Sequence, residues 1–107
     1  MRATTTHVQI TTTCDTPRVC EDITAALLED RLAACVQVSD VESLYVWEGK
    51  RTRKQEYLLT IKTRQELAPD VEETILKFHT YKVPEILTTP ILAGSDPYLG
   101  WIDEATE

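Results

Sequence analysis

The chain has 107 residues, of which 42% are hydrophobic and 7% aromatic, enough to build one domain with a modest core. Its formal net charge of −7 argues against the clustered positive surface with which proteins bind nucleic acid. No apolar run approaches the ~20 residues of a membrane span, and the N-terminus lacks the apolar core of a signal peptide. We therefore expect one cytoplasmic domain, residues 1–107, that binds neither nucleic acid nor membrane.

The first part of the chain has the pattern of a strand, a helix and a second strand. Residues 7–13 alternate apolar and polar side chains, which is typical of a half-buried strand. Pro17 fits the first turn of a helix, and apolar residues at helical spacing predict that helix over residues 17–31. Strand character returns over residues 32–38, and Ser39-Asp40 predicts a break after it.

A long β-hairpin is predicted over residues 43–62. Two strand-like runs, residues 44–47 and 57–61, flank a polar stretch, residues 48–55, which contains a glycine and predicts the turn. A hairpin this long in so short a chain has more edge and aromatic surface than one small core covers. We therefore expect a partner surface.

The last part predicts a helix, a strand and a short final helix. The helix opens at Ala68-Pro69, and its apolar residues recur at three and four positions up to Phe78. Residues 85–92 have strand character, and Pro90, which lacks an amide donor, places this strand at a sheet edge or at a bulge. Residues 98–104 form the final helix.

The resulting order, β-α-β-β-α-β with an appended helix, predicts a ferredoxin-like α+β sandwich. Two helices would return over one face of an antiparallel sheet. The other face has no covering layer within the chain, which indicates self-association, most simply into a closed ring.

His79 is the first candidate for chemistry, because Tyr81 and Glu85 follow closely and all three can ligate or exchange a proton. The alternative is a histidine that only caps a helix end. Cys14 precedes a helix N-terminus, a position that lowers the pKa of a thiol. Cys14, Cys20 and Glu85 could complete a metal site with His79 only after folding.

Other residues carry weaker signals. We expect His7 to be a surface histidine and Cys35 a small core residue. Cys14 or Ser43 could act as a nucleophile with His79 as base, yet no nucleophile elbow accompanies them, so we do not expect an enzyme. The aromatic residues fit either a ligand platform or an interface: Tyr45, Trp47 and Trp101.

Five blocks across the chain resemble the CutA divalent-cation-tolerance proteins in order and spacing. They are RLAAC (31–35), SLYVWEGK (43–50), IKTR (61–64), HTYKVPEI (79–86) and YLGW (98–101). The resemblance implies a ferredoxin-like protomer in a PII-like homotrimer with clefts between subunits, and tolerance of copper or another divalent metal ion. Bacterial members carry a His-His-Pro-Tyr run, for which this chain has Phe78-His79-Thr80-Tyr81, and an early cysteine, from which Cys14 is displaced.

The resulting hypothesis is a homotrimeric, non-enzymatic protein of metal-ion homeostasis that binds copper weakly through His79, Cys14 and Glu85. The alternative is a PII-like signalling module that takes a small anion in an intersubunit cleft. Its ligand-binding residues would be Tyr45, Trp47, Lys62 and Tyr81, with Arg64 nearby.

Overall fold

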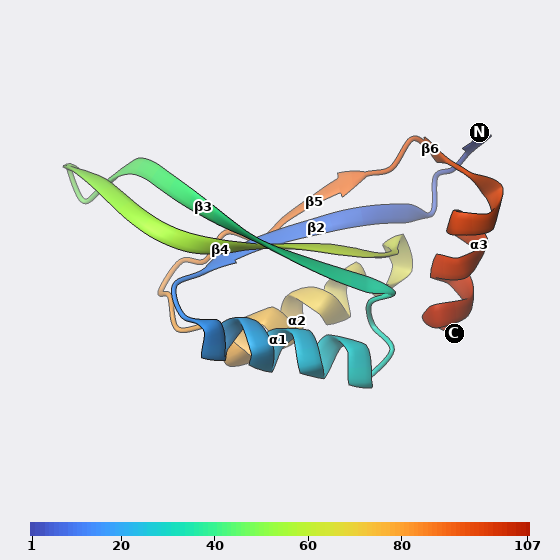
Figure 1. The fold of residues 1–107 in the computed structure, drawn as a ribbon, viewed down its shortest axis with the longest axis horizontal. Coiled ribbons are helices and arrows are strands. Elements are labelled where there is room, and N and C mark those ends of the chain that lie inside the picture. Colours follow the sequence, from blue (N-terminus) through green and yellow to red (C-terminus); the bar gives the residue numbers. More distant parts are fainter.

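A four-stranded antiparallel sheet with the strand order β3-β4-β2-β5 forms the centre of the computed structural model, which describes residues 1–107 (Figure 1). The main elements are β2 (His7–Cys14), α1 (Pro17–Glu29), β3 (Cys35–Trp47), β4 (Lys50–Arg64), α2 (Ala68–Phe78), β5 (Leu87–Pro90) and α3 (Asp96–Ala105). Helices α1 and α2 lie on the same face of the sheet (Figure 1). The predicted ferredoxin-like α+β fold with an extra C-terminal helix is confirmed.

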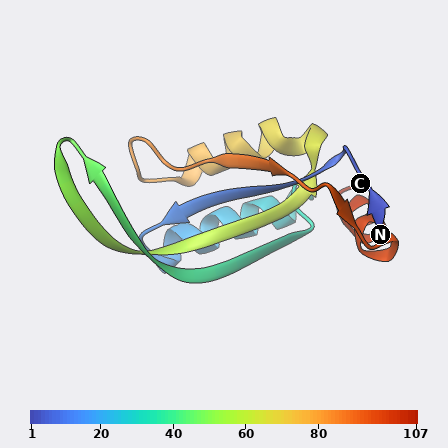
Figure 2. The same ribbon diagram turned by 90° about the horizontal axis from the view of Figure 1, so that it is seen from above.

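The two chain ends meet in a second, very small sheet that the sequence did not predict. Strand β1 (Arg2–Ala3) pairs antiparallel with β6 (Ala93–Gly94), and α3 follows directly (Figure 2). A short 3₁₀ helix, η1 (Gln65–Leu67), leads into α2. The N-terminus and the C-terminal helix thus lie together, at the opposite end of the molecule from the hairpin tip (Figure 1).

The core lies between the sheet and the two helices. Ile10 and Leu59 from the sheet face Ile23 of α1 and Ile75 of α2, and each of these side chains is at most 1% exposed. Burial of one such aliphatic side chain contributes about 1.5–3 kcal/mol to folding. None of the helices is long and apolar enough to cross a membrane.

Local signals explain where α1 begins and ends. The Thr16 hydroxyl accepts a hydrogen bond from the Val19 amide at 3.3 Å, and Pro17 occupies the first helical position. The helix ends at Glu29 rather than at the predicted Arg31. Arg31 has φ of 56°, a left-handed conformation that cannot continue the helix.

The hairpin is longer and its turn shorter than predicted. Strands β3 and β4 pair from Cys35 opposite Lys62 to Trp47 opposite Lys50, leaving only Glu48 and Gly49 in the loop. Both loop residues have positive φ, 50° and 79°, which is the geometry of a tight two-residue hairpin turn. The predicted turn over residues 48–55 was therefore wrong.

The predicted break at Ser39-Asp40 was also wrong, because β3 continues through both residues. Ser39 lies opposite Leu58 and Asp40 opposite Tyr57 in an unbroken ladder. Polar side chains are tolerated there because the strand lies at the sheet edge, where β3 is exposed to solvent. The prediction for Pro90 is confirmed, since it ends β5 at the other edge of the sheet.

Candidate functional site

His79 follows the last residue of α2 and joins this helix to the end of β2. Its Nε2 donates a hydrogen bond to the Thr13 carbonyl at 2.7 Å, and its Nδ1 accepts one from the Tyr81 amide at 3.1 Å. The two bonds fix the ring as the tautomer with its proton on Nε2. The residue is therefore the helix-end cap considered from the sequence, and it also anchors the loop that follows.

The structure brings Cys14 and His79 together, although 65 residues separate them. Cys14 Sγ lies 3.9 Å from His79 Nε2 at the carboxyl end of β2. Cys14 is fully buried, and burial raises the pKa of its thiol to about 12, with further contributions from the nearby Cys20, Asp15 and Glu56. The expectation that the helix N-terminus lowers this pKa was wrong, because loss of solvation outweighs the helix dipole.

Glu85 lies in the loop between α2 and β5, where its carboxylate accepts a hydrogen bond from the Thr11 hydroxyl at 2.9 Å. It does not form a three-residue cluster with Cys14 and His79. No three His, Cys, Asp or Glu side chains of the protomer are arranged to hold a metal ion. The donors that are brought together, one thiol and one imidazole, suit copper or zinc.

A cleft of about 750 Å³ lies between the hairpin and the loop that follows His79. Three of the four residues expected to bind a cleft ligand contribute to its wall: Tyr45, Trp47 and Tyr81. Glu85 also lines it, as do Lys54, Glu56 and Lys82, none of which was among the four residues predicted to bind a cleft ligand.

Tyr81 is the polar centre of this cleft. Its hydroxyl donates to Glu56 Oε2 at 2.5 Å, and Lys54 Nζ lies 4.4 Å from the centroid of its ring. Burial, followed by the hydrogen bond to Glu56, raises the pKa of Tyr81 above its usual range. Tyr81 therefore remains a protonated hydrogen-bond donor, and Lys54 also contacts Asp15 at 3.4 Å.

Lys62 lies far from the cleft. Its ammonium donates to Gln37 Oε1 at 2.5 Å. Lys62 pairs with Cys35, the first residue of β3, whereas Tyr45 is the eleventh residue of that strand. Lys62 is therefore roughly 33 Å from Tyr45 along the strand. The cations that line the cleft are Lys54 and Lys82. Two-residue alternation from Glu56 would have revealed Lys54, had residues 50–55 been assigned to a strand.

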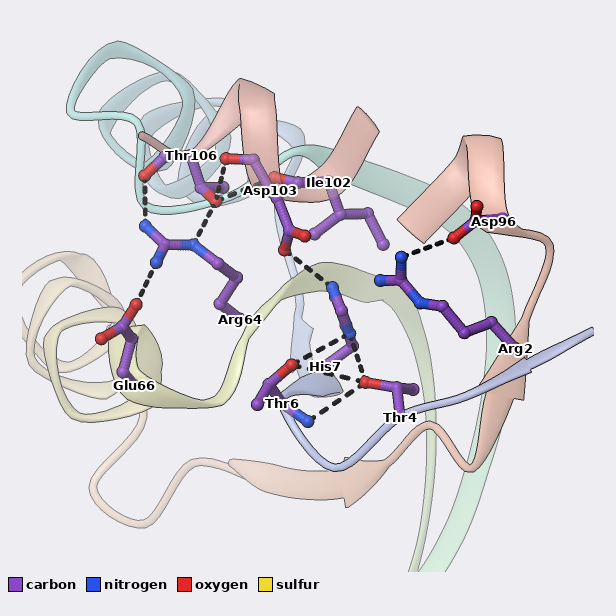
Figure 3. A network of polar contacts seen from close by, with 10 residues as sticks. All are labelled: Arg2, Thr4, Thr6, His7, Arg64, Glu66, Asp96, Ile102, Asp103 and Thr106. Atoms are coloured by element: carbon purple, nitrogen blue, oxygen red, sulfur yellow. Dashed lines mark hydrogen bonds and ion pairs between the residues drawn. The ribbon is translucent and has the colours of Figure 1, made fainter. Parts of the chain in front are cut away.

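The prediction that His7 lies on the surface was wrong. His7 is only 2% exposed, and its Nε2 lies 2.8 Å from Asp103 Oδ1 while its Nδ1 lies 2.5 Å from the Thr4 hydroxyl (Figure 3). Arg64 contacts Thr106 in the same network (Figure 3). These contacts dock α3 on the sheet and lie at the opposite end of the molecule from the cleft. No local sequence pattern signals these contacts, because Asp103 is 96 residues from His7.

Comparison with known proteins identifies the family. Residues 8–105 match the family described as CutA1 divalent ion tolerance protein. The divalent-cation tolerance protein CutA of Thermus thermophilus is 41% identical over 95 residues, covering 88% of this chain and 92% of that protein. Mouse protein CutA is 38% identical over 96 residues, and the match covers 89% of this chain but 54% of the mouse protein, so the chain spans about half of that relative.

Solved structures agree with the sequence match. The structure of the periplasmic divalent cation tolerance protein CutA from Archaeoglobus fulgidus has a TM-score of 0.91 and 37% identity, and the alignment covers 94% of this chain and 99% of that one. The family model, the curated relatives and this shared fold all lead to one assignment: the chain belongs to the CutA1 family of divalent ion tolerance proteins.

Proposed function

We propose that the protein is a cytoplasmic, non-enzymatic homotrimer of divalent-cation tolerance that binds copper or a similar ion weakly at His79. Membership of the CutA1 family supports the role in tolerance. The single observation that supports a metal site at this place is the 3.9 Å separation of Cys14 Sγ and His79 Nε2.

This separation suits one bridging ion. Typical bonds of ~2.0 Å to imidazole nitrogen and ~2.3 Å to thiolate sulfur place the two donors ~3.5 Å apart at a tetrahedral angle and ~4.3 Å apart in a linear arrangement. The observed 3.9 Å falls between these limits. Glu85, which lines the neighbouring cleft, is the proposed third donor after local adjustment.

Binding at this pair carries two costs, which is why we propose weak affinity. The ion must replace the hydrogen bond from His79 Nε2 to the Thr13 carbonyl, and it must displace the proton of a thiol whose pKa is raised to about 12. Metal binding therefore releases a proton and strengthens as pH rises. The same raised pKa makes Cys14 a poor nucleophile, which supports a non-enzymatic role.

The proposed trimer rests on the exposed edge of the sheet. Strand β3 offers thirteen residues of edge to solvent, and it exposes Val38, Leu44 and Val46 by 51%, 58% and 68%. Long exposed edges with apolar side chains readily pair with another chain. A second copy of the same protein is the simplest partner.

The anion-binding alternative has little support within the protomer. Lys62, the cation on which it depended, lies at the other end of the hairpin. The charged residues that line the cleft are two lysines, Lys54 and Lys82, and two glutamates, Glu56 and Glu85. The cleft therefore offers no net positive charge to an anion.

A copper(II) titration against a competing chelator tests the metal site. It is made at moderate salt to suppress nonspecific binding to the acidic surface. We expect saturable binding by the unmodified protein, its loss in His79→Ala, and its retention in Lys62→Ala. Native mass is recorded for each protein to show that assembly is unchanged. Equal copper binding by His79→Ala and the unmodified protein would contradict the site.

A further inference from the structure

Two side chains of opposite charge meet at Tyr81 in the cleft of about 750 Å³. Glu56 Oε2 accepts a hydrogen bond from the Tyr81 hydroxyl at 2.5 Å, and Lys54 Nζ lies 4.4 Å from the centroid of the Tyr81 ring. A carboxylate and an ammonium group thus contact the same side chain. The proposed metal site at His79 uses neither of them.

Glu56 is a nearly buried carboxylate with one oxygen available to a ligand. The residue is only 6% exposed, although it lines the cleft. Its Oε2 bonds to Tyr81, whereas Oε1 has no hydrogen-bond partner in the chain and is not sealed from solvent. A carboxylate in so dry a place is stabilised by further hydrogen-bond donors, above all by charged ones. Glu56 is therefore suited to bind an ammonium group that enters the cleft.

The lysines of the cleft supply the opposite charge. Lys54 already contacts Asp15 at 3.4 Å, but an ammonium group has three donors, so it can bind a second carboxylate. Lys82 is exposed and makes no ion pair within the chain. The other carboxylate in the wall, Glu85, is exposed and accepts a hydrogen bond from the Thr11 hydroxyl, so Glu56 is the drier anchor of the two.

An aromatic wall stands beside these charges. Tyr45 and Trp47 line the cleft and lie two residues apart on β3, so their side chains share one face of the hairpin. They are 40% and 46% exposed, which leaves ring surface uncovered in the protomer. Such surface packs favourably against an aromatic or aliphatic group of a ligand.

We propose that this cleft binds a free α-amino acid with an aromatic or large apolar side chain. Its ammonium group bonds to Glu56, its carboxylate to Lys54 and Lys82, and its side chain packs on Tyr45 and Trp47. A zwitterion matches a cleft that carries both signs of charge and no net charge, whereas an anion alone would leave Glu56 opposed to it. The volume lies within the range of roughly 300–1,000 Å³ typical of small-molecule sites. The inference goes beyond the proposed function and does not require the metal.

Isothermal titration calorimetry with L-phenylalanine as the probe tests the ligand class. Three analogues each lack one feature: 3-phenylpropanoate the ammonium group, phenethylamine the carboxylate, and glycine the side chain. We expect saturable binding of one L-phenylalanine per chain and at least about 10-fold weaker binding of each analogue, because each loses a charge-assisted hydrogen bond or the aromatic contact. Equal binding of any analogue, or no binding of L-phenylalanine, L-tryptophan and L-leucine at millimolar concentration, would overturn the inference.

Glu56→Gln and Glu73→Gln form a matched pair of variants. Gln at position 56 has the same size and still accepts from Tyr81, but it lacks the charge, so L-phenylalanine affinity should fall at least about 10-fold. Glu73 is exposed on α2 and does not line the cleft, so its variant should bind like the unmodified protein. Circular dichroism and native mass show that both variants are folded and assembled. Equal affinity in the two variants would overturn the inference.

A third variant, Lys82→Gln, changes an exposed loop residue and is therefore expected to fold. It should weaken L-phenylalanine binding without weakening phenethylamine binding, because only the first ligand has a carboxylate. A general disturbance of the cleft would weaken both ligands alike. That result, or unchanged binding of L-phenylalanine, would contradict the placement of the carboxylate.

Discussion

At the residue scale, burial decides the properties of the candidate groups. Cys14 precedes α1 in sequence, and this position alone suggests a thiol of lowered pKa. The folded chain instead surrounds it with the core, and the pKa rises to about 12. Burial depends on residues distant in sequence, which is why a local pattern could locate Cys14 but could not predict its chemistry.

The raised pKa of Cys14 makes stability depend on alkaline pH. A thiol with pKa about 12 in the folded state and 9.0 in the unfolded state holds its proton more tightly when folded. Its stabilising contribution is therefore complete below pH 9 and is lost as pH rises toward 12. In chemical denaturation, Cys14→Ala should lose less stability over this range than the unmodified protein. Parallel pH profiles for the two proteins would contradict the buried thiol.

His7 makes a second prediction at this scale. Replacement by Ala removes a buried ring, leaves Asp103 and Thr4 without their partner, and should lower the free energy of unfolding by about 2 kcal/mol or more. Thr5→Ala, at an exposed neighbouring position, serves as the control and should change it by less than ~0.5 kcal/mol. Urea denaturation at fixed protein concentration measures both. A loss in His7→Ala no greater than that in Thr5→Ala would show that the contacts in Figure 3 contribute little.

At the element scale, the sequence predicted the helices well and divided the hairpin incorrectly. Caps and apolar periodicity are local signals, so α1 and α2 were found within two residues of their observed ends. The charged segment from Lys50 to Gln55 has low strand propensity, yet β3 provides it with a full ladder of partners. Once that segment is a strand, alternation places Lys54 and Glu56 in the cleft beside Tyr81. The sequence could not place them there without the pairing.

The hairpin tip makes a prediction at the element scale. Glu48 has φ of 50°, which is unfavourable for Glu and well tolerated by Asn. Glu48→Asn, an exposed substitution, should therefore raise the free energy of unfolding by up to about 0.5 kcal/mol. Glu42→Asn, within extended β3, is the control and should lower it, because Asn disfavours strands and the hydrogen bond from Gln55 Nε2 to the Glu42 carboxylate is lost. If Asn has the same effect at both positions, the two-residue turn is wrong.

At the scale of the whole molecule, the fold class and the family follow from the sequence, but the site does not. The order of elements predicted the fold class, and the five short blocks of sequence predicted the family. The proximity of Cys14 and His79 joins positions 65 residues apart and appears only after β2 and α2 pack. The same packing places Lys62 far from the aromatic residues that were predicted to bind a cleft ligand together with it.

The proposed trimer is tested at this scale by native mass spectrometry and light scattering. The expected mass is three times the 12.2 kDa of one chain, because pairing of the β3 edge covers its apolar side chains. Val46→Lys, which places a charge at this exposed edge, should shift the mass toward one chain, whereas Leu28→Lys, on the exposed side of α1, should not. A mass of 12.2 kDa for the unmodified protein at micromolar concentration would exclude an obligate trimer.

We propose that copper binds beside His79 through sulfur and imidazole donors, and X-ray absorption spectroscopy of the copper-loaded protein tests this proposal most directly. We expect a sulfur shell at ~2.3 Å together with imidazole nitrogen at ~2.0 Å. The imidazole signal should be lost in His79→Ala and retained in Lys62→Ala. A spectrum with oxygen donors alone, unchanged by His79→Ala, would mean that copper binds only the acidic surface and would contradict the site.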